Sequence, residues 1–514
     1  MDAARGASPS PADESAVSST APESPADNAH PRIAPSDQPE TDPASMAARR
    51  RSVFQTPLNN GVAHPRVRYA SKSTPPTGSA ASPTEISGCG GHSSCSGSTS
   101  DLTVLEIPSS APRVSALNRV AIPPVTAAPT QQAVASVRNE PSSGAGMGYH
   151  GHQMVRGVNI GGFLVPEFWI TPSLIANIPD PKPNDYLELC QKLGPDATRN
   201  LMLRHWDSWV TEAEIRRLAG AGLTHLRVPI GHWEFVDSGE GYVGGGLPYF
   251  KRLVYWANEY GLKVIPDMHT APGSQNGFDN SGSTNAISWT KDPNNVALSK
   301  RALIAMLKYL ASDPVVLATV DAVDLLNEPL IDALDFDQLW DYDAGGHTLV
   351  TERLRKVPPA VSIIDRGFKE FRWWQSRWPR DWNTKYSDAW LDAHLYHVFD
   401  RNIDDWPLEK HLQLVCQHGR DLKSNATFFP IIVGEWSLAL PKAALKRGRE
   451  NEARRRFAET QLDAYELGGA GWIFWCFKTE ESPEWSFLDA LDRSWLPQPL
   501  TNREFPPTCY RPGL

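Results

Sequence analysis

Two glutamates, Glu328 and Glu435, are the side chains of this sequence best suited to acid–base and nucleophilic chemistry. Each ends an apolar run, Ala322-Val-Asp-Leu-Leu-Asn-Glu-Pro329 in one case and Phe429-Pro-Ile-Ile-Val-Gly-Glu-Trp436 in the other. Such a run is typical of a buried strand that carries an acid to the rim of an α/β barrel. Cleavage of a glycosidic bond needs two carboxyl groups, one to protonate the leaving group and one to stabilise the anomeric carbon. Either glutamate alone would be interpreted as a buried, salt-bridged structural residue, but the pair predicts glycosidase chemistry.

Short β-rich apolar runs alternate with longer helical stretches from Val155 onward, as in repeated βα units around a parallel sheet. The expected strands are residues 155–160, 224–229, 263–268, 322–326, 360–364, 390–396, 429–434 and 471–477. The expected helices are residues 212–221, 249–260, 296–311, 352–357, 368–378, 408–422 and 451–467. Three glycines, Gly222, Gly261 and Gly468, follow helices where a left-handed cap is expected. The predicted fold is of the α/β class, a (β/α)8 TIM barrel.

Polar and aromatic side chains recur near the C-terminal ends of the expected strands. They are Arg227, His269, Asn327, Glu328, His394, Tyr396, Glu435 and Trp475. In a (β/α)8 barrel these ends form one face, so residues that are distant in sequence converge on one pocket. A random arrangement would scatter such residues over both ends of the strands. The sequence therefore predicts one catalytic pocket, in which the amide of Asn327 can bond the 2-hydroxyl group of a sugar.

The first 150 residues differ in composition from the rest of the chain. They are crowded with Pro, Ser, Ala, Thr and Gly, and all 18 Trp of the 514-residue chain lie beyond Met154. A segment with so few large apolar residues does not bury enough surface to offset the entropy of ordering. We expect residues 1–150 to be disordered and residues 151–514 to form one catalytic domain.

Charge and hydropathy exclude several classes of protein. The formal net charge of −9 leaves no basic footprint for a nucleic acid. The sequence contains no run of 18 or more apolar residues, which argues against a membrane span. The N-terminal sequence Met1-Asp-Ala-Ala-Arg5 is not followed by the hydrophobic core of a signal peptide.

Several ordered motifs give the chain a resemblance to a known family. They are Gly157-Val-Asn-Ile-Gly-Gly162, Thr171-Pro-Ser-Leu174, His225-Leu-Arg-Val-Pro-Ile-Gly231, His269-Thr-Ala-Pro-Gly-Ser-Gln-Asn-Gly-Phe-Asp-Asn-Ser-Gly282, Asn327-Glu-Pro329, His394-Leu-Tyr396, Gly434-Glu-Trp-Ser437 and Gly471-Trp-Ile-Phe-Trp475. Over about residues 153–510 the chain resembles the fungal exo-β-1,3-glucanases of glycoside hydrolase family 5. Asn-Glu-Pro alone would be a weak signal, whereas the long motif that ends at Gly282 is highly specific.

The resemblance implies that Glu328 is the general acid/base and Glu435 the nucleophile of a retaining double displacement. A retaining pair requires a carboxyl separation of about 5 Å. The residues implied to bind the terminal glucose are Glu167, Arg227, His269, Asn280, Asn327, His394, Tyr396 and Trp475. Phe278 and Phe399 match the aromatic clamp that the family uses for the next glucose. Judged from the residues alone, Trp475 could equally be core packing and His269 a buried structural histidine.

The chain departs from the family at two places on the wall of the first subsite. It reads Phe163-Leu-Val-Pro-Glu-Phe-Trp169 where the family has Trp and then Leu-Glu-Pro, and Phe477-Lys478 where the family has Trp-Lys. These changes put the aglycone preference in doubt rather than the reaction. The resemblance also implies that Cys416 pairs with Cys509, which would require an oxidising compartment. Secretion or a cell-wall location is therefore expected, with the cytoplasm as the alternative because no signal peptide is evident.

The expected function is retaining release of glucose from the non-reducing end of β-1,3-glucan by a monomer, with transglycosylation as a side activity and with no metal or organic cofactor. One alternative is a β-glucosidase that acts on a glucosyl lipid, such as glucosylceramide or a sterol glucoside, which suits a chain without a signal peptide. A second alternative is a non-catalytic carbohydrate-binding wall protein on the same barrel. Retention of both glutamates and of the polar residues around them argues against the second alternative.

Overall fold

The computed structural model describes residues 153–510, apart from residues 285–286, 357 and 379–387. The segment predicted to be disordered, residues 1–150, lies outside the described residues. Within the described part, no helix has the length and apolar character needed to cross a membrane.

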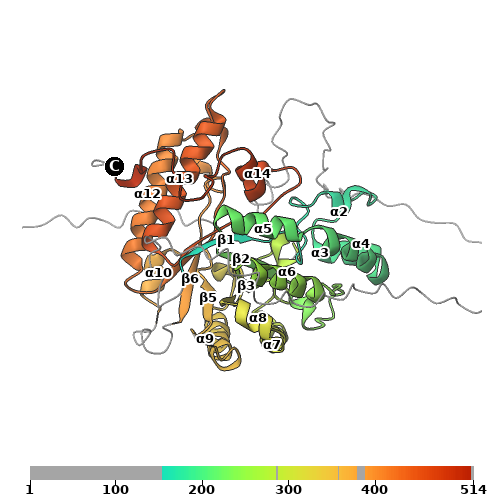
Figure 1. The fold of residues 1–514 in the computed structure, drawn as a ribbon. Helices are drawn as coiled ribbons and strands as arrows, with labels where there is room; N and C mark the ends of the chain where they lie inside the picture. Colours follow the sequence, from blue (N-terminus) through green and yellow to red (C-terminus); the bar gives the residue numbers. More distant parts are fainter. Residues whose placement is uncertain (1–152, 285–286, 357, 379–387, 511–514) are drawn as a thin grey trace, which may run out of the picture.

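Eight parallel strands close into a barrel in the order of the sequence, which confirms the predicted (β/α)8 fold (Figure 1). The strands are β1 (Val155–Asn159), β2 (His225–Ile230), β3 (Lys263–Met268), β4 (Ala322–Asp324), β5 (Val361–Asp365), β6 (Ala389–His394), β7 (Ile431–Glu435) and β8 (Gly471–Phe474). Their register places chemically important residues side by side across neighbouring strands. Asn159 lies beside Arg227, Asp267 beside Asp324, and His394 beside Glu435.

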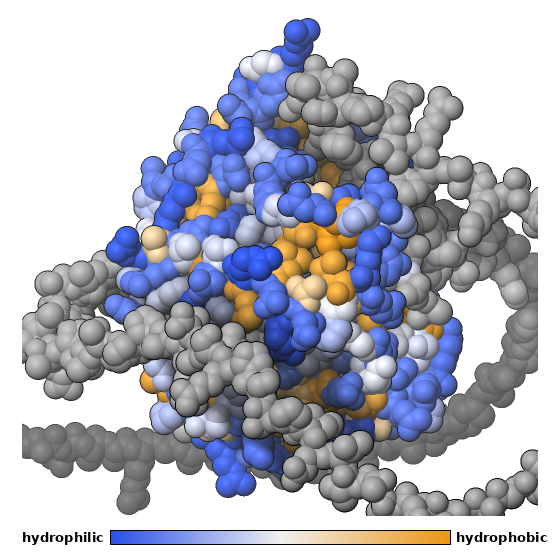
Figure 2. Space-filling view, turned by 90° about the vertical axis from the view of Figure 1, so that its right-hand side faces the viewer, coloured by the Kyte–Doolittle hydropathy of each residue, from blue (hydrophilic) through white to orange (hydrophobic). Residues whose placement is uncertain are grey.

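Helices surround the barrel, with α12 and α13 side by side and with α7, α8 and α9 over another part of its circumference (Figure 1). The helices are α2 (Ser173–Ala176), α3 (Tyr186–Leu193), α4 (Pro195–Ser208), α5 (Glu212–Ala221), α6 (Leu247–Glu259), α7 (Pro293–Ala311), α8 (Pro314–Thr319), α9 (Phe336–Arg353), α10 (Phe371–Gln375), α12 (Leu408–Asn425), α13 (Glu450–Gly468) and α14 (Phe487–Asp492). The outward face in Figure 2 is mostly hydrophilic, with hydrophobic residues gathered in a patch near its centre.

Alternation along the strands separates two apolar layers. Ile431 and Val433 belong to the large cluster between barrel and helices, whereas Ile432 between them belongs to a small cluster inside the barrel. Because side chains two positions apart share a face of a strand, Ile363 and Asp365 point to the same side, the barrel interior. The same step leads from Ala322 to Asp324, from Ile265 to Asp267 and from Trp390 to Asp392. The barrel interior is therefore apolar toward the N-terminal ends of the strands and acidic at their C-terminal ends.

Several helix predictions were wrong. The helix expected over residues 352–357 is α9, which begins at Phe336 and ends at Arg353. The part of α9 before residue 352 was not predicted, because it contains the adjacent glycines Gly345 and Gly346 and glycine lowers helix propensity. At Gly346 an added Cβ would lie 3.0 Å from Leu325, so the glycine permits close packing of α9 on the strand layer.

Other boundaries also differ from the predicted ones. Helices α3 and α4 were not predicted at all. The helix expected over residues 368–378 is only α10, because Phe368 has a left-handed φ of 64° and the helix begins after it. Gly222 and Gly261 take the expected positive φ, but Gly468 is the last residue of α13 and is followed by an extended Gly469.

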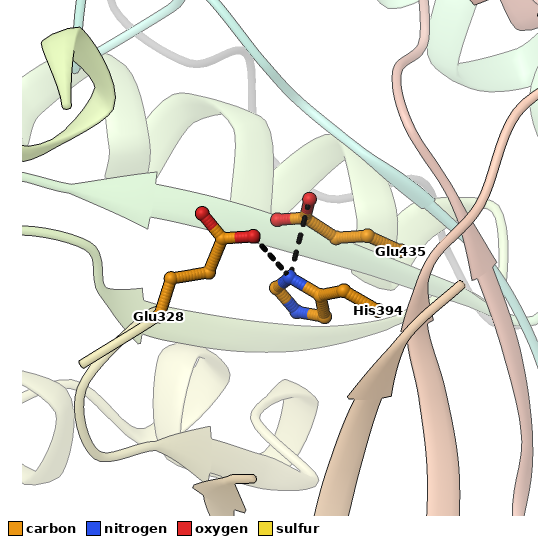
Figure 3. Close-up of side chains that lie close together, drawn as sticks. All are labelled: Glu328, His394 and Glu435. Atoms are coloured by element: carbon orange, nitrogen blue, oxygen red, sulfur yellow. Dashed lines mark hydrogen bonds and ion pairs between the residues drawn. The ribbon is translucent and has the colours of Figure 1, made fainter. Parts of the chain in front are cut away.

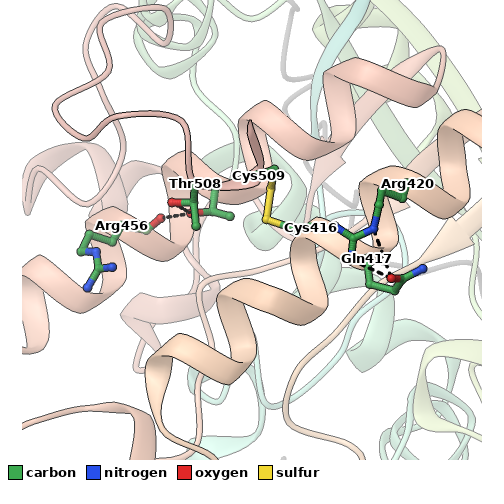
Figure 4. The surroundings of a disulfide bond; sticks show 7 residues. Cys416, Gln417, Arg420, Arg456, Thr508 and Cys509 are labelled. Atoms are coloured by element: carbon green, nitrogen blue, oxygen red, sulfur yellow. Dashed lines mark hydrogen bonds between the residues drawn. A yellow bond between two sulfur atoms is a disulfide. The ribbon is translucent and has the colours of Figure 1, made fainter. Parts of the chain in front are cut away.

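A disulfide joins Cys416 of α12 to Cys509, with Cα atoms 5.0 Å apart, and confirms the expected pairing (Figure 4). The C-terminal segment is also bonded to α13, where the Glu459 carboxylate accepts the backbone N–H groups of Glu504 and Phe505 at 2.8 Å each. The disulfide and these bonds together hold the segment against the α12–α13 pair.

We predict that the double substitution Cys416→Ser and Cys509→Ser lowers the free energy of unfolding by about 3 to 5 kcal/mol, because an unfolded chain without the cross-link gains loop entropy. The closed loop spans 93 positions. Urea unfolding of the variant and of the native protein, each with and without a reductant, measures the difference. Reduced native protein should match the variant, and coincident midpoints for oxidised native protein and variant would contradict the prediction.

Candidate active site

The residues predicted from strand ends meet at one end of the barrel. A pocket opens there. Its lining consists of Glu167, Trp169, Asp279, Asn280, Tyr396, Phe399, Glu435 and Trp475. Trp169 and Asp279 were missed by the sequence analysis. Asp279 is next to Asn280 in the chain, and Trp169 lies two positions from Glu167, so the near neighbours of the named residues carried the signal.

Arg227 is completely buried and bonds to residues from four other parts of the barrel. Its guanidinium donates to Asp324 at 2.7 and 3.0 Å and to Glu435 at 3.3 Å, and it forms an ion pair with Asp267 at 3.2 Å. Burial opposes the charge, but these carboxylates outweigh it and raise the pKa of Arg227 well above its ordinary value. The amide oxygens of Asn159 and Asn327 accept the remaining bonds, both at 2.8 Å. Arg227 thus orients Glu435 and neutralises part of the acidic layer.

Glu435 ends β7 and is held at both carboxylate oxygens. Arg227 donates to Oε1, and the Tyr396 hydroxyl donates to Oε2 at 2.6 Å. Gly434, the residue before Glu435, leaves room for Asp392, because a Cβ at position 434 would lie 2.0 Å from Asp392 Oδ2. The Gly434 N–H donates to Asp392 Oδ1 at 2.6 Å. The glycine therefore lets Asp392 hold the main chain directly before Glu435.

Glu328 lies just beyond β4 with a left-handed φ of 44°. Its Oε2 accepts a bond from Asn280 at 2.9 Å, and its Oε1 lies 2.8 Å from His394 Nδ1. Figure 3 shows the His394 ring beneath both glutamates, which extend toward each other from opposite sides. A carboxylate oxygen of Glu328 lies within 4.8 Å of one of Glu435. This distance suits a retaining pair, whereas an inverting pair needs a separation of about 6.5 Å or more.

His269 and Trp475 form a flat wall, with ring centroids 5.6 Å apart and planes 8° from parallel. His269 Nδ1 is hydrogen-bonded to Asp267 Oδ2 at 2.5 Å. Burial, aided by the nearby Arg227 charge, lowers the pKa of His269 to about 3, so the ring is neutral. Two buried atoms, His269 Nε2 and Asn327 Nδ2, have no hydrogen-bond partner within the described part of the chain. Both are suited to the hydroxyl groups of a ligand.

The two phenylalanines of the expected clamp have different surroundings. Phe399 lines the pocket and lies against Tyr396 and Trp485, with ring centroids 5.2 and 6.1 Å away. Phe278 is 2% exposed and lies edge-on against Phe368 at 6.0 Å. Of the two, only Phe399 belongs to the pocket lining, and the clamp stays a prediction.

Buried aspartates lie below the pocket, Asp267 and Asp324 beside Arg227 and Asp365 and Asp392 beside His394. Burial raises the pKa of Asp267 to about 7, that of Asp324 to about 8 and that of Asp365 to about 7. Burial opposes the charge on His394, but Glu435, Asp365 and Asp392 outweigh it and raise the pKa of His394 well above its usual value. The side chains whose spacing would suit a metal are Glu328, His394 and Glu435, and also Asp365, Asp392 and His394. In both groups the cation that faces the carboxylates is His394.

Helix α4 contacts the chain just before the first departure from the family and contacts Phe477 of the second. Trp209, which caps α4, donates to the Gly161 carbonyl at 3.0 Å, and His205 Nε2 lies 2.7 Å from the Gly162 carbonyl. Phe477 meets Trp209 edge-on at 5.8 Å. The altered aromatic residue is therefore buried against α4.

Known proteins resemble this chain over its barrel. The probable glucan 1,3-β-glucosidase A of Emericella nidulans is 36% identical over 395 residues, which are 70% of this chain and 93% of that protein. The glucan 1,3-β-glucosidase of Kluyveromyces lactis is 32% identical over 404 residues, 69% of this chain and 91% of that protein. The chain belongs to the glucan 1,3-β-glucosidase family of glycoside hydrolase family 5. It is accordingly a glycosidase.

No protein-family model matches the chain. The crystal structure of rutinosidase from Aspergillus niger superimposes with a TM-score of 0.57 at 21% identity, and covers 66% of this chain and 97% of its own. At that identity the likeness concerns the fold alone.

We predict that Tyr396→Phe lowers kcat/KM for a chromogenic aryl β-glucoside by about 10- to 100-fold, because Glu435 loses a charge-assisted hydrogen bond. Steady-state kinetics measures the change. Tyr465→Phe is the matched control, since the Tyr465 hydroxyl donates to Gln461 at 3.2 Å and does not line the pocket. Equal rates for the two variants would contradict the role of Tyr396.

We predict that acid destabilises the protein partly through His205. Burial lowers the pKa of His205 to about 4 from an ordinary value of 6.5. Between these values the unfolded chain binds a proton that the native state does not, so the free energy of unfolding falls as pH falls, by about 3 kcal/mol in total. His205→Gln keeps a donor for Gly162 and should reduce the loss between pH 7 and about pH 4.5. Urea unfolding at both pH values tests this, and an unchanged pH dependence would contradict it.

Proposed function

We propose that this protein is a retaining β-glucosidase that releases glucose from the non-reducing end of β-1,3-glucan. The observation that carries the proposal is the approach of Glu328 and Glu435 to within 4.8 Å in the pocket. That spacing leaves room for direct attack on the anomeric carbon rather than for an interposed water. The names of the Emericella nidulans and Kluyveromyces lactis relatives support the β-1,3-glucan substrate.

In the first step Glu435 attacks the anomeric carbon while Glu328 gives a proton to the departing glycosidic oxygen. In the second step Glu328 takes a proton from water, which attacks the glycosyl enzyme and frees Glu435. Arg227 and Tyr396 hold the Glu435 carboxylate with one hydrogen bond to each oxygen. These bonds favour the ionised form that a nucleophile needs.

The polar atoms around the pair suit a terminal glucose. Glu167 lines the pocket, and the indole N–H of Trp169 donates to its Oε2 at 3.0 Å. His269 Nε2 and Asn327 Nδ2 supply one acceptor and one donor for hydroxyl groups. The Trp475 ring offers a plane for the apolar face of the sugar.

Aromatic residues at the pocket rim bear on the fate of the glycosyl enzyme. Trp169, Tyr396 and Phe399 all contact Trp485 at ring-centroid distances of 5.2 to 6.1 Å. A sugar held on this rim would compete with water for the intermediate, so transglycosylation accompanies hydrolysis.

We further propose a monomer in a secreted or wall location, with residues 151–514 as one catalytic domain. The Cys416–Cys509 disulfide supports the location, since such bonds persist in oxidising compartments.

The alternatives receive less support. The names of the relatives favour glucan over a glucosyl lipid, and membership of a glycosidase family disfavours a non-catalytic wall protein. Rates of glucose release from laminari-oligosaccharides and from glucosylceramide in detergent micelles, measured side by side, distinguish a glucan substrate from a glucosyl lipid. Faster turnover of the lipid would overturn the glucan assignment.

We predict that Glu435→Gln and Glu328→Gln each lower glucose release from laminaritriose by about 10³-fold or more, because each removes a reacting group. Proton NMR of the native reaction should show β-glucose first. Glu466→Gln is the matched control, because Glu466 binds Arg156 at 2.8 Å and does not line the pocket. Initial α-glucose would disprove retention, and an active Glu435→Gln protein would disprove the assigned nucleophile.

A further inference from the structure

The imidazole of His394 joins two catalytic glutamates to two aspartates that have no assigned role. Its Nδ1 lies 2.8 Å from Glu328 Oε1 and 3.4 Å from Glu435 Oε2 (Figure 3). Its Nε2 lies 3.4 Å from Asp365 Oδ2 and 3.4 Å from Asp392 Oδ2. Each ring nitrogen therefore faces two carboxylates, one pair at the pocket and one pair below it.

Asp365 also holds the main chain of Glu328. The Glu328 N–H donates to Asp365 Oδ2 at 3.0 Å, and the Glu328 carbonyl accepts a bond from Asn276 at 3.1 Å. A left-handed backbone at a residue with a side chain costs about 1 to 3 kcal/mol and persists only where its surroundings hold it. The other Asp365 oxygen accepts the N–H of Gly367 at 2.7 Å, which fixes the carboxylate in turn.

Asp392 has the corresponding relation to Glu435. Its Oδ1 accepts the N–H of Gly434, the residue before the glutamate, at 2.6 Å. Its Oδ2 fills the space that a side chain at position 434 would need. Both aspartates are almost fully buried, so water does not replace these bonds.

We propose that Asp365 and Asp392 are positioning residues, Asp365 for the proton-transferring Glu328 and Asp392 for the nucleophile Glu435, and that both act through backbone hydrogen bonds and through His394. The proposal rests on the proposed roles of the two glutamates and deepens them. Asp365 sets the direction from which Glu328 delivers its proton. Asp392 sets the position from which Glu435 attacks.

The electrostatics of the cluster are consistent with this division. Glu435, Asp365 and Asp392 together keep His394 a cation in spite of its burial, as its raised pKa indicates. A cation between Glu328 and Glu435 partly offsets the repulsion between their carboxylates. Removal of either aspartate therefore disturbs His394 as well as one glutamate backbone.

The test compares two substrates that differ in their need for a proton. Dinitrophenyl β-glucoside has a leaving group that departs unprotonated, whereas laminaribiose requires protonation by the acid. Asp365→Asn should lower kcat/KM for laminaribiose about 10- to 100-fold more than for the dinitrophenyl glucoside. Asp392→Asn should lower kcat/KM for both substrates by similar factors, because both need the nucleophile.

Two controls separate positioning from loss of structure. Asp321 lies 3.4 Å from His225 before the start of β4, at the opposite end of the barrel, and Asp321→Asn removes a matched Asp–His contact. It should cost stability without any difference between substrates. Asp365→Ala removes both acceptor oxygens as well as the charge, and it should show the same substrate difference as Asp365→Asn even if one of the two variants folds poorly.

Outcomes for Glu328→Gln distinguish this proposal from the proposed function. If Glu328→Gln shows no difference between the substrates, the assigned acid is wrong and the proposed function fails first. If Glu328→Gln shows the difference but both Asp365 variants lower the two rates equally, the positioning role of Asp365 is overturned. If Asp392→Asn impairs laminaribiose selectively, the division between the two aspartates is overturned.

Discussion

The buried guanidinium of Arg227 is the charge on which the mouth of the barrel depends. A cation without water is stable only when it is paired and fully hydrogen-bonded. Arg227 meets this requirement with Asp267, Asp324 and Glu435 as ion partners. Because these partners stand on different strands, the same contacts that neutralise the charge also tie β2, β3, β4 and β7 together at the site of the chemistry.

His394 is the second buried cation, and it completes the charge balance on the other side of the pocket. Arg227 orients one oxygen of Glu435, and His394 stands between Glu435 and Glu328. The carboxyl groups of Glu328 and Glu435 are thus brought close despite their repulsion. A protein interior favours such an arrangement only where each carboxylate has a donor, and here Tyr396 donates to Glu435 and Asn280 donates to Glu328.

Strand alternation predicted most of the barrel because it is a local property. Eight apolar runs were visible, and polar residues at their ends indicated a common pocket. The helices were harder to predict. The double glycine in α9 predicts a helix break from sequence, yet Gly346 lies within the helix and allows Leu325 to pack closely against it. The need for a glycine at position 434 was equally invisible in the sequence, since the neighbour that requires it is Asp392, which lies 42 positions earlier in the chain.

The sequence by itself determined the order of strands, the two glutamates and most of the polar residues around them, because periodicity and motif spacing are written along the chain. Tertiary structure alone decided how the aspartates at the strand ends are used. Asp267, Asp324, Asp365 and Asp392 look alike in sequence, each two positions beyond an apolar residue. Barrel closure gives two of them to Arg227 and the other two to His394. Electrostatic partners are chosen by distance in space, and only the closed sheet sets those distances.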